Sequence, residues 1–214
     1  MRKKIEQYIK HHKRGLGIAA SSIVVVATGT FLWLYLIEGA APVVPPEFTD
    51  AIQRMDKLAP QLLTEANRTS QGTAEIEKLL QNNDKGTILG RIAEEKKAVA
   101  NIRNSVGEMP RDIEVMINTL PGIKPRAARQ VATEAVANLT KFAQSLVKFS
   151  DLMNQTLSVL EKGVGGEDIS SELSALASQV NNEVTDTNDF SGKYGTLMAE
   201  FRKITHEDAP APQG

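Results

Sequence analysis

The sequence predicts an all-α protein, in which an N-terminal transmembrane helix precedes an elongated antiparallel four-helix bundle or coiled-coil domain. Two observations predict this fold. Residues 15–37 form an uncharged apolar run between a basic start and an acidic remainder. From Phe48 onward, apolar residues recur at alternating steps of three and four for more than 150 residues, which is the period of an α-helix with one buried face.

The charge of the chain is segregated. Residues 1–14 hold six Lys or Arg and one acid, which leaves 19 basic and 25 acidic residues for the rest. Such a segment is typical of a basic cytoplasmic tail that contacts anionic lipid. The chain has no cysteine, which excludes disulfides and thiolate metal sites. The membrane-surface residues expected from the charge pattern are Arg2, Lys3, Lys4, Lys10, Lys13 and Arg14.

Residues 15–37 are long enough to cross a bilayer. As a helix they would span roughly 34 Å, against a hydrocarbon core of about 30 Å. Phe31, Trp33 and Tyr35 gather at the far end, as in an interfacial aromatic belt. Basic residues before the span and acids after it predict a cytoplasmic N-terminus. We therefore expect a single-pass protein of the inner (plasma) membrane whose bulk is extracytoplasmic, or periplasmic.

Two other interpretations of this run stay open. A cleaved signal peptide normally has a shorter apolar core of about 7–15 residues. Its best cleavage position here, after Gly39-Ala40-Ala41, is followed by Pro42, which hinders a peptidase. A helix buried in a soluble core would not explain the change of charge across the run.

The outer region divides into a linker, four helical stretches and a tail. Three prolines between Gly39 and Glu47 predict a stiff linker over residues 38–47. The bundle is expected over 48–205, with Thr49 as its first N-cap, and a disordered tail over 206–214. The expected helices are 48–83, 87–120 with a bend at Pro110, 125–162 and 168–205.

Short connections make neighbouring helices antiparallel. Four stretches of similar length therefore predict an up-down-up-down bundle about 50 Å tall. The turn at 120–125 would then lie at the membrane-facing end. A two-helix coiled coil that completes its core in a dimer is the alternative architecture.

Polar side chains interrupt the apolar stripes of the predicted helices. In the predicted antiparallel bundle they would lie at similar distances along its long axis. A buried carboxylate is unfavourable unless it has a partner, so Glu95 and Glu183 need a hydrogen bond, an ion pair or a ligand. Lys96 or Arg91 is the expected partner of Glu95. The group forms either a register-fixing polar layer or a ligand site, and its members are Thr69, Thr73, Glu95, Glu183 and Thr187.

Residues 120–131 (LPGIKPRAARQV) resemble a helix-hairpin-helix motif over about a dozen residues. The resemblance implies that backbone amides at the glycine turn and the next helix start contact a DNA phosphate. Lys124 stands where the family has its second glycine, which argues against close backbone approach. The same residues, Gly122, Lys124, Arg126 and Arg129, are alternatively expected to contact lipid headgroups, or simply to close one helix and open the next.

No nucleophile elbow, phosphate loop or zinc spacing occurs in the chain, so we expect no enzyme, cofactor or metal. The long heptad seams favour a membrane-anchored scaffold or interaction module of an envelope complex, with a protein partner or a second copy. One alternative is a ligand-sensing domain that acts through a partner, similar in length and topology to the extracytoplasmic four-helix domains of chemoreceptors and sensor kinases. The second is a membrane-anchored DNA-binding protein that uses the turn at 120–131.

Overall fold

The structure is a computed structural model that describes residues 42–81 and 85–205. The described residues belong to one compact unit that begins at Pro42. The predicted basic tail, the predicted membrane span at 15–37 and the predicted C-terminal tail lie outside the described residues. Within the described ranges, no helix combines the length and hydropathy that crossing a bilayer requires.

The described residues are almost entirely α-helical, which confirms the all-α prediction. The backbone forms no strand in residues 42–81 and 85–205, apart from one isolated bridge between Val43 and Lys124. The helices are α2 (Pro46–Gln81), α3 (Lys85–Val106), α4 (Met109–Thr119), the short 3-10 helix η1 (Leu120–Gly122), α5 (Arg126–Gly165) and α6 (Ser170–Thr205).

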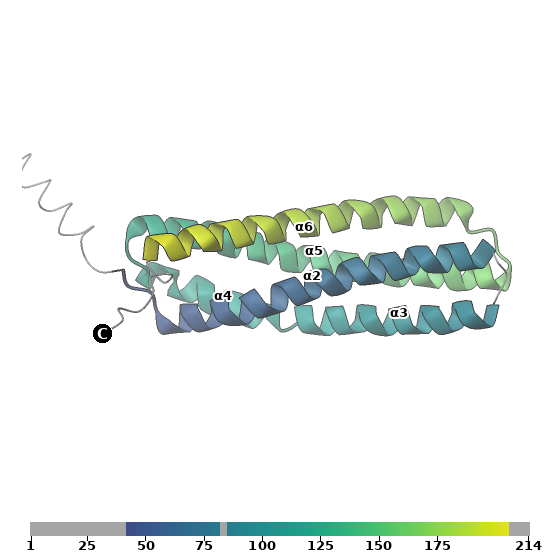
Figure 1. Cartoon of the computed structure of the whole chain (residues 1–214), viewed down its shortest axis with the longest axis horizontal. Helices are drawn as coiled ribbons and strands as arrows, with labels where there is room; N and C mark the ends of the chain where they lie inside the picture. The colour runs from purple at the N-terminus through teal and green to yellow at the C-terminus, as the bar shows by residue number, and fades with distance from the viewer. Residues whose placement is uncertain (1–41, 82–84, 206–214) are drawn as a thin grey trace, which may run out of the picture. The chain divides into compact units, whose positions relative to one another are not determined.

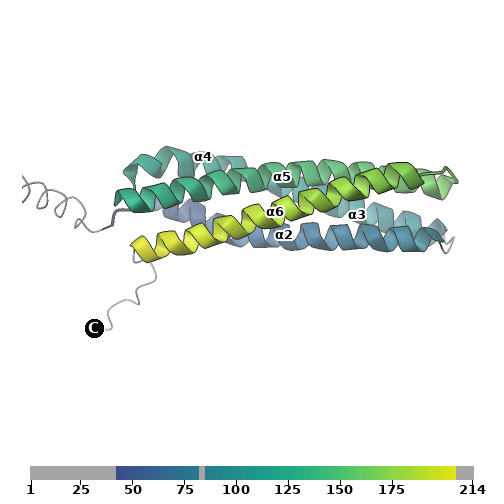
Figure 2. The ribbon, with the colours of Figure 1, turned by 90° about the horizontal axis from the view of Figure 1, so that it is seen from above.

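The helices lie side by side in an elongated bundle (Figures 1 and 2). Helices α3 and α4 follow each other end to end along one edge, and the other three each run most of the length. Helix α5 packs against α3, α4 and α6, and α2 packs against α3, α4 and α6. Successive long helices run in opposite directions, so that α2 begins and α6 ends at the same end of the bundle.

The core follows the apolar period of the sequence. Nearly all of the predicted seam positions on α2, α3, α4 and α5 are buried in one continuous core. Burial of the apolar stripe is less complete on α6. Its partly buried members are Leu173, Phe190, Leu197 and Ile204. Burial of one stripe on each helix is what holds helices of this length together, since helix propensity alone contributes little.

Several helix ends differ from the predictions. Helix α2 begins at Pro46 rather than at 48, because proline fits the first helical turn, where a backbone N–H has no helical acceptor. Thr49 therefore lies inside the helix and is not the N-cap. The expected bend at Pro110 is instead a break at residues 107–108, and the proline opens α4. Helix α5 continues to Gly165, and Gly166 ends it in the left-handed conformation at φ 97°.

Contacts among distant segments close the end of the bundle at which α2 begins. The backbones of Val43 and Lys124 exchange hydrogen bonds of 2.9 and 3.1 Å. The rings of Phe48 and Phe201 pack with centroids 5.6 Å apart. The carboxylate of Asp56 on α2 accepts hydrogen bonds from side chains of α6, namely Tyr194 and Arg202.

Candidate functional site

The five polar residues of the predicted layer are all buried, as expected, but they do not form one cluster. Glu95 lies against α2 on one side of the bundle. Glu183 and Thr187 lie against α5 on another side. Thr69 is in the core, and Thr73 lines a separate cavity. The sequence predicted that these residues would be buried, but not which helices they would contact.

Glu95 fills a notch that α2 leaves open at Gly72. A methyl group at position 72 would collide with the carboxylate of Glu95, so this side chain occupies the space that glycine provides. Glu95 is 3% exposed, and its Oε2 has no hydrogen-bond partner among the described residues. The hydroxyl of Thr69, one helical turn from Gly72, is likewise without a partner in the described part of the chain.

The expected ion-pair partners of Glu95 are engaged elsewhere, so that prediction was wrong. Lys96 pairs with Glu161 at 2.7 Å, and Arg91 pairs with Glu75 and Glu94. Burial raises the pKa of Glu95, and the positive charges of Arg68 and Arg91 offset this only in part. Glu95 is thus a buried acid that is more easily protonated than usual.

We expect Glu95→Met to raise the free energy of unfolding by about 1–3 kcal/mol at mildly alkaline pH, since an unpaired buried charge is replaced by an apolar chain of similar length. The folded state binds the proton of Glu95 more tightly than the unfolded state does. The stability of the natural protein should therefore fall as pH rises above the ordinary value of 4.5 and through the raised pKa. Urea unfolding of the full chain at several pH values measures this effect.

The matched control is Glu94→Met, which changes an exposed neighbouring acid on the same helix. The advantage of Glu95→Met should shrink at acidic pH, where the natural carboxyl is neutral, whereas Glu94→Met should show no such trend. A gain from Glu95→Met that stays constant from acidic to alkaline pH would contradict the assignment of a buried charge.

Glu183 is satisfied by a residue that the sequence did not single out. The hydroxyl of Ser145 on α5 donates to Glu183 Oε1 at 2.6 Å. Ser145 Oγ also lies 2.7 Å from the hydroxyl of Thr187, which in turn donates to the backbone carbonyl of Glu183. Lys148 Nζ lies 3.9 Å from the other carboxylate oxygen. These contacts join α5 to α6 and give this pair of polar residues a structural role.

A mainly apolar groove of about 550 Å³ lies between α4 and α5, next to the end of α3, and we call it the α4–α5 groove. It opens beside the break at 107–108. Ile117 (50% exposed) and Val147 (38%) project into it without cover. Sequence reasoning missed the groove because both residues lie outside the heptad seam. Polar side chains at the edge of the groove include those of Arg103, Glu114 and Thr140.

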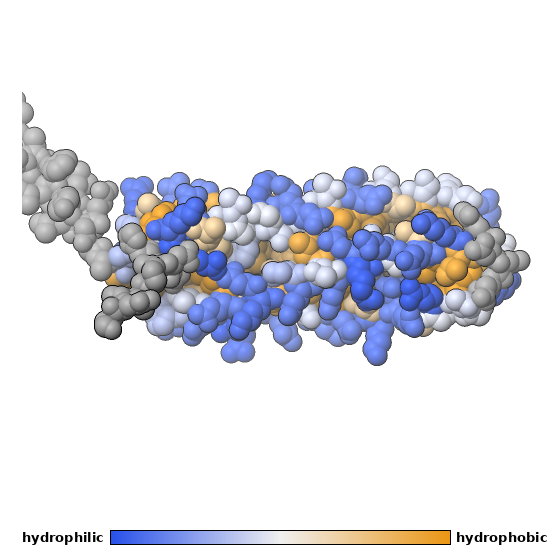
Figure 3. Space-filling view, in the orientation of Figure 1, coloured by the Kyte–Doolittle hydropathy of each residue, from blue (hydrophilic) through white to orange (hydrophobic). Residues whose placement is uncertain are grey.

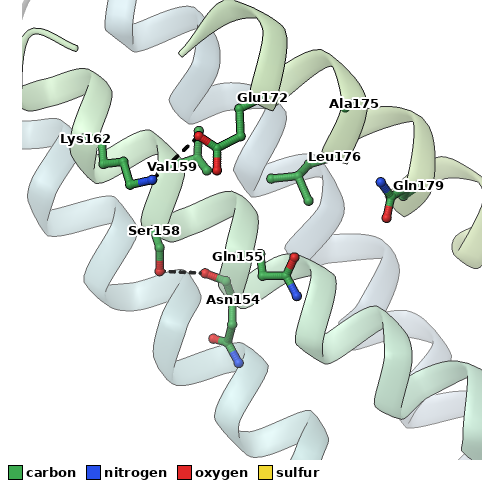
Figure 4. A pocket seen from close by; sticks show the side chains of 9 residues that line it. All are labelled: Asn154, Gln155, Ser158, Val159, Lys162, Glu172, Ala175, Leu176 and Gln179. Carbon is green, nitrogen blue, oxygen red and sulfur yellow. Dashed lines mark hydrogen bonds and ion pairs between the residues drawn. The ribbon is translucent and has the colours of Figure 1, made fainter. Parts of the chain in front are cut away.

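A second, more polar depression lies between α5 and α6 near the opposite end of the bundle (Figure 4). It measures about 490 Å³ and is edged by an ion pair between Lys162 and Glu172 at 3.6 Å. The hydroxyl of Ser158 donates to the backbone carbonyl of Asn154 and so belongs to the helix rather than to the depression. The side chains drawn in Figure 4 stand apart around an open surface.

The turn at 120–125 uses its backbone groups within the chain. The N–H of Ile123 donates to Leu120, and that of Lys124 donates to Val43. Pro45 packs so closely on Gly122 that a Cβ at 122 would lie 3.0 Å from its ring. The glycine therefore serves contact with the segment that precedes α2. The basic side chains of Lys124 and Arg126 are exposed at this end of the bundle, and Arg129 donates to the carbonyl of Pro121 at 3.5 Å.

The visible face of the bundle is mostly hydrophilic, with apolar side chains showing in the seams between helices (Figure 3). Within residues 42–81 and 85–205, no three His, Cys, Asp or Glu side chains gather closely enough to hold a metal ion. The basic residues predicted to contact the membrane surface at positions 2–14 lie outside these ranges. No protein-family model, curated protein or solved structure matches the chain.

Proposed function

We propose that the chain is a membrane-anchored extracytoplasmic scaffold that associates with a second copy of itself through the α4–α5 groove. The observation that carries this proposal is the exposure of Ile117 and Val147 in one groove. Exposed apolar side chains gathered in one concave surface mark an interaction site more often than scattered ones do. The anchor is the uncharged run at 15–37, with the basic residues before it on the cytoplasmic side.

A second copy suits the groove because its charges are self-complementary. Two copies held in one membrane have parallel bundles, and a two-fold axis along the bundle places α4 of one copy opposite α5 of the other. Arg103, near the end of α3, and Asp151 on α5 pair at 2.5 Å within the chain and are about half exposed, so they lie at equal heights beside the groove. Across the axis each would meet its opposite charge.

The other charged residue of the groove meets no like charge in this arrangement. Glu114 lies on α4 and Thr140 on α5, and both line the groove, so the carboxylate of one copy would face the part of the other copy's groove that carries a hydroxyl. The apolar side chains of the groove would then bury one another. The same parallel arrangement keeps both N-terminal segments on one side, as a shared membrane requires.

We expect the double variant Ile117→Lys and Val147→Lys to convert a dimer into a monomer, because both changes place a charge of the same sign in an apolar contact. The mass of the full chain in mild neutral detergent, measured by light scattering, gives the result. The matched control is Leu89→Lys, which charges an equally exposed residue (47%) outside the groove and should leave the dimer intact. A natural chain that is monomeric at every concentration would refute self-association.

The anchor and its orientation are tested separately. Protease added to intact spheroplasts should digest residues 42–205 and spare the N-terminal basic segment, which an epitope at the N-terminus would report. Digestion only after the spheroplasts are lysed would place the bundle inside and contradict the proposed orientation. Recovery of a soluble mature chain that begins near Pro42 would show that the run at 15–37 is a cleaved signal.

A further inference from the structure

A small cavity of about 150 Å³ lies between α2, α5 and α6, apart from the α4–α5 groove. Its lining combines buried and exposed residues. Met153, Thr156 and Val180 are buried, as is Thr73, whereas Glu77 is half-buried and Asn181 is exposed. The cavity therefore has an apolar and hydroxyl floor, and a carboxylate and an amide at its mouth.

The hydroxyl groups of this floor can only accept hydrogen bonds from a guest. Thr73 donates its proton to the carbonyl of Thr69 at 3.0 Å, and Thr156 donates to the carbonyl of Leu152 at 2.9 Å. A hydroxyl has one proton and two lone pairs, so each of these oxygens keeps free acceptor capacity. Because the protons of both threonines are used within their own helices, this part of the floor offers only acceptors to a guest.

The carboxylate of Glu77 adds a negative charge to this set of acceptors. Among the described residues no Lys, Arg or His lies within ion-pair distance of it, although the other acids of the region, such as Glu75, are paired. Burial raises the pKa of Glu77, so its charged form is less favoured there than in water. A cation at the mouth would offset this penalty.

We propose that this cavity binds a small primary alkylammonium compound, with its ammonium group between Glu77 and the hydroxyls of Thr73 and Thr156 and its alkyl chain against Met153 and Val180. An ammonium group has three donors and no acceptor, which matches the carboxylate of Glu77 and the two threonine hydroxyls. A cavity of this volume holds a guest of about six non-hydrogen atoms, as a 150 Å³ cavity that admits benzene shows. This inference does not depend on the proposed scaffold role.

The test measures binding of propylammonium to the full chain, kept in a neutral detergent throughout, by titration calorimetry and thermal unfolding. We expect saturable binding and a rise in the unfolding temperature. Propanol, which keeps the alkyl chain without the charge, should bind at least about tenfold more weakly, since a hydrogen bond to a charged group is worth about 1.5–3 kcal/mol. Propionate, which has the wrong charge, should not bind.

Variants of the chain separate specific binding from a general salt effect. Glu77→Gln should weaken propylammonium binding by about tenfold or more, and Thr156→Val, which keeps the shape of the side chain, should weaken it by a smaller factor. The matched control Glu65→Gln neutralises an exposed acid on the same helix outside the cavity and should bind as the natural chain does. Circular dichroism checks that each variant is folded.

The proposal is overturned if propylammonium does not bind, if propionate binds as well, or if Glu77→Gln and Glu65→Gln have equal effects. Binding of propylammonium by a chain that is monomeric and soluble would support the cavity while refuting the scaffold proposal. The two failures are therefore distinguishable.

Discussion

Replacing Val25 and Leu32 with aspartate is expected to move most of the chain out of the membrane fraction. Both residues lie inside the uncharged run at 15–37. An aspartate near the centre of a transmembrane helix, as at position 25, opposes insertion by about 2.5–3.5 kcal/mol, and a second one at position 32, nearer the aromatic end, adds a smaller cost. Sedimentation of membranes after extraction at alkaline pH measures the bound fraction.

The control exchanges the two side chains, as Val25→Leu with Leu32→Val, and keeps the hydropathy of the run unchanged. This control should remain in the membrane fraction. If the aspartate variant stays there as well, the run does not anchor the chain, and contact through residues 1–14 or through a partner would have to explain membrane association.

Replacing Phe201 with alanine is expected to lower the free energy of unfolding by about 3–5 kcal/mol, the usual effect of removing a fully buried aromatic side chain. Phe201 is fully buried at the end of α6 and packs on Phe48 at the start of α2, with their rings tilted by 58°. The variant leaves a cavity where the first and last helices meet. Urea or thermal unfolding of the full chain should show a melting temperature lower by roughly 6–20 °C.

Phe190→Ala provides the comparison, because it removes the same side chain from a site on α6 that is only partly buried. Its ring lies beneath the ammonium group of Lys141 at 5.7 Å. We expect a smaller loss, about 1–2 kcal/mol, since less apolar surface leaves the core. Equal losses of stability at the two positions would mean that the contact of Phe201 with Phe48 contributes no more than the packing of a partly buried ring.

The helices could be predicted from the sequence because each carries one stripe of apolar residues with the helical period. This stripe predicted the buried faces of α2, α3, α4 and α5 nearly residue by residue. The helix boundaries were predicted less accurately, because they depend on the local backbone chemistry of residues such as proline. Pro46 starts α2 early, and Pro110 opens α4 after a break where a bend was expected.

The sites were harder to predict than the helices, because a site depends on which helices become neighbours. The seam showed that Glu95 and Glu183 would be buried. It did not show that Gly72 makes room for Glu95 or that Ser145 satisfies Glu183, since both contacts join different helices. The α4–α5 groove and the small cavity likewise form where two or three helices diverge, which no periodicity in one helix reports.

The backbone bridge between Val43 and Lys124 has a mechanical consequence. Tension applied to the chain ahead of Pro42 would reach the junction of η1 and α5 through these two hydrogen bonds before it could peel the first turn of α2. The load would be shared by segments that are some eighty residues apart in sequence. In a pulling experiment, Val43→Pro, which removes the N–H donor of one bond, should therefore lower the force at which the bundle first yields.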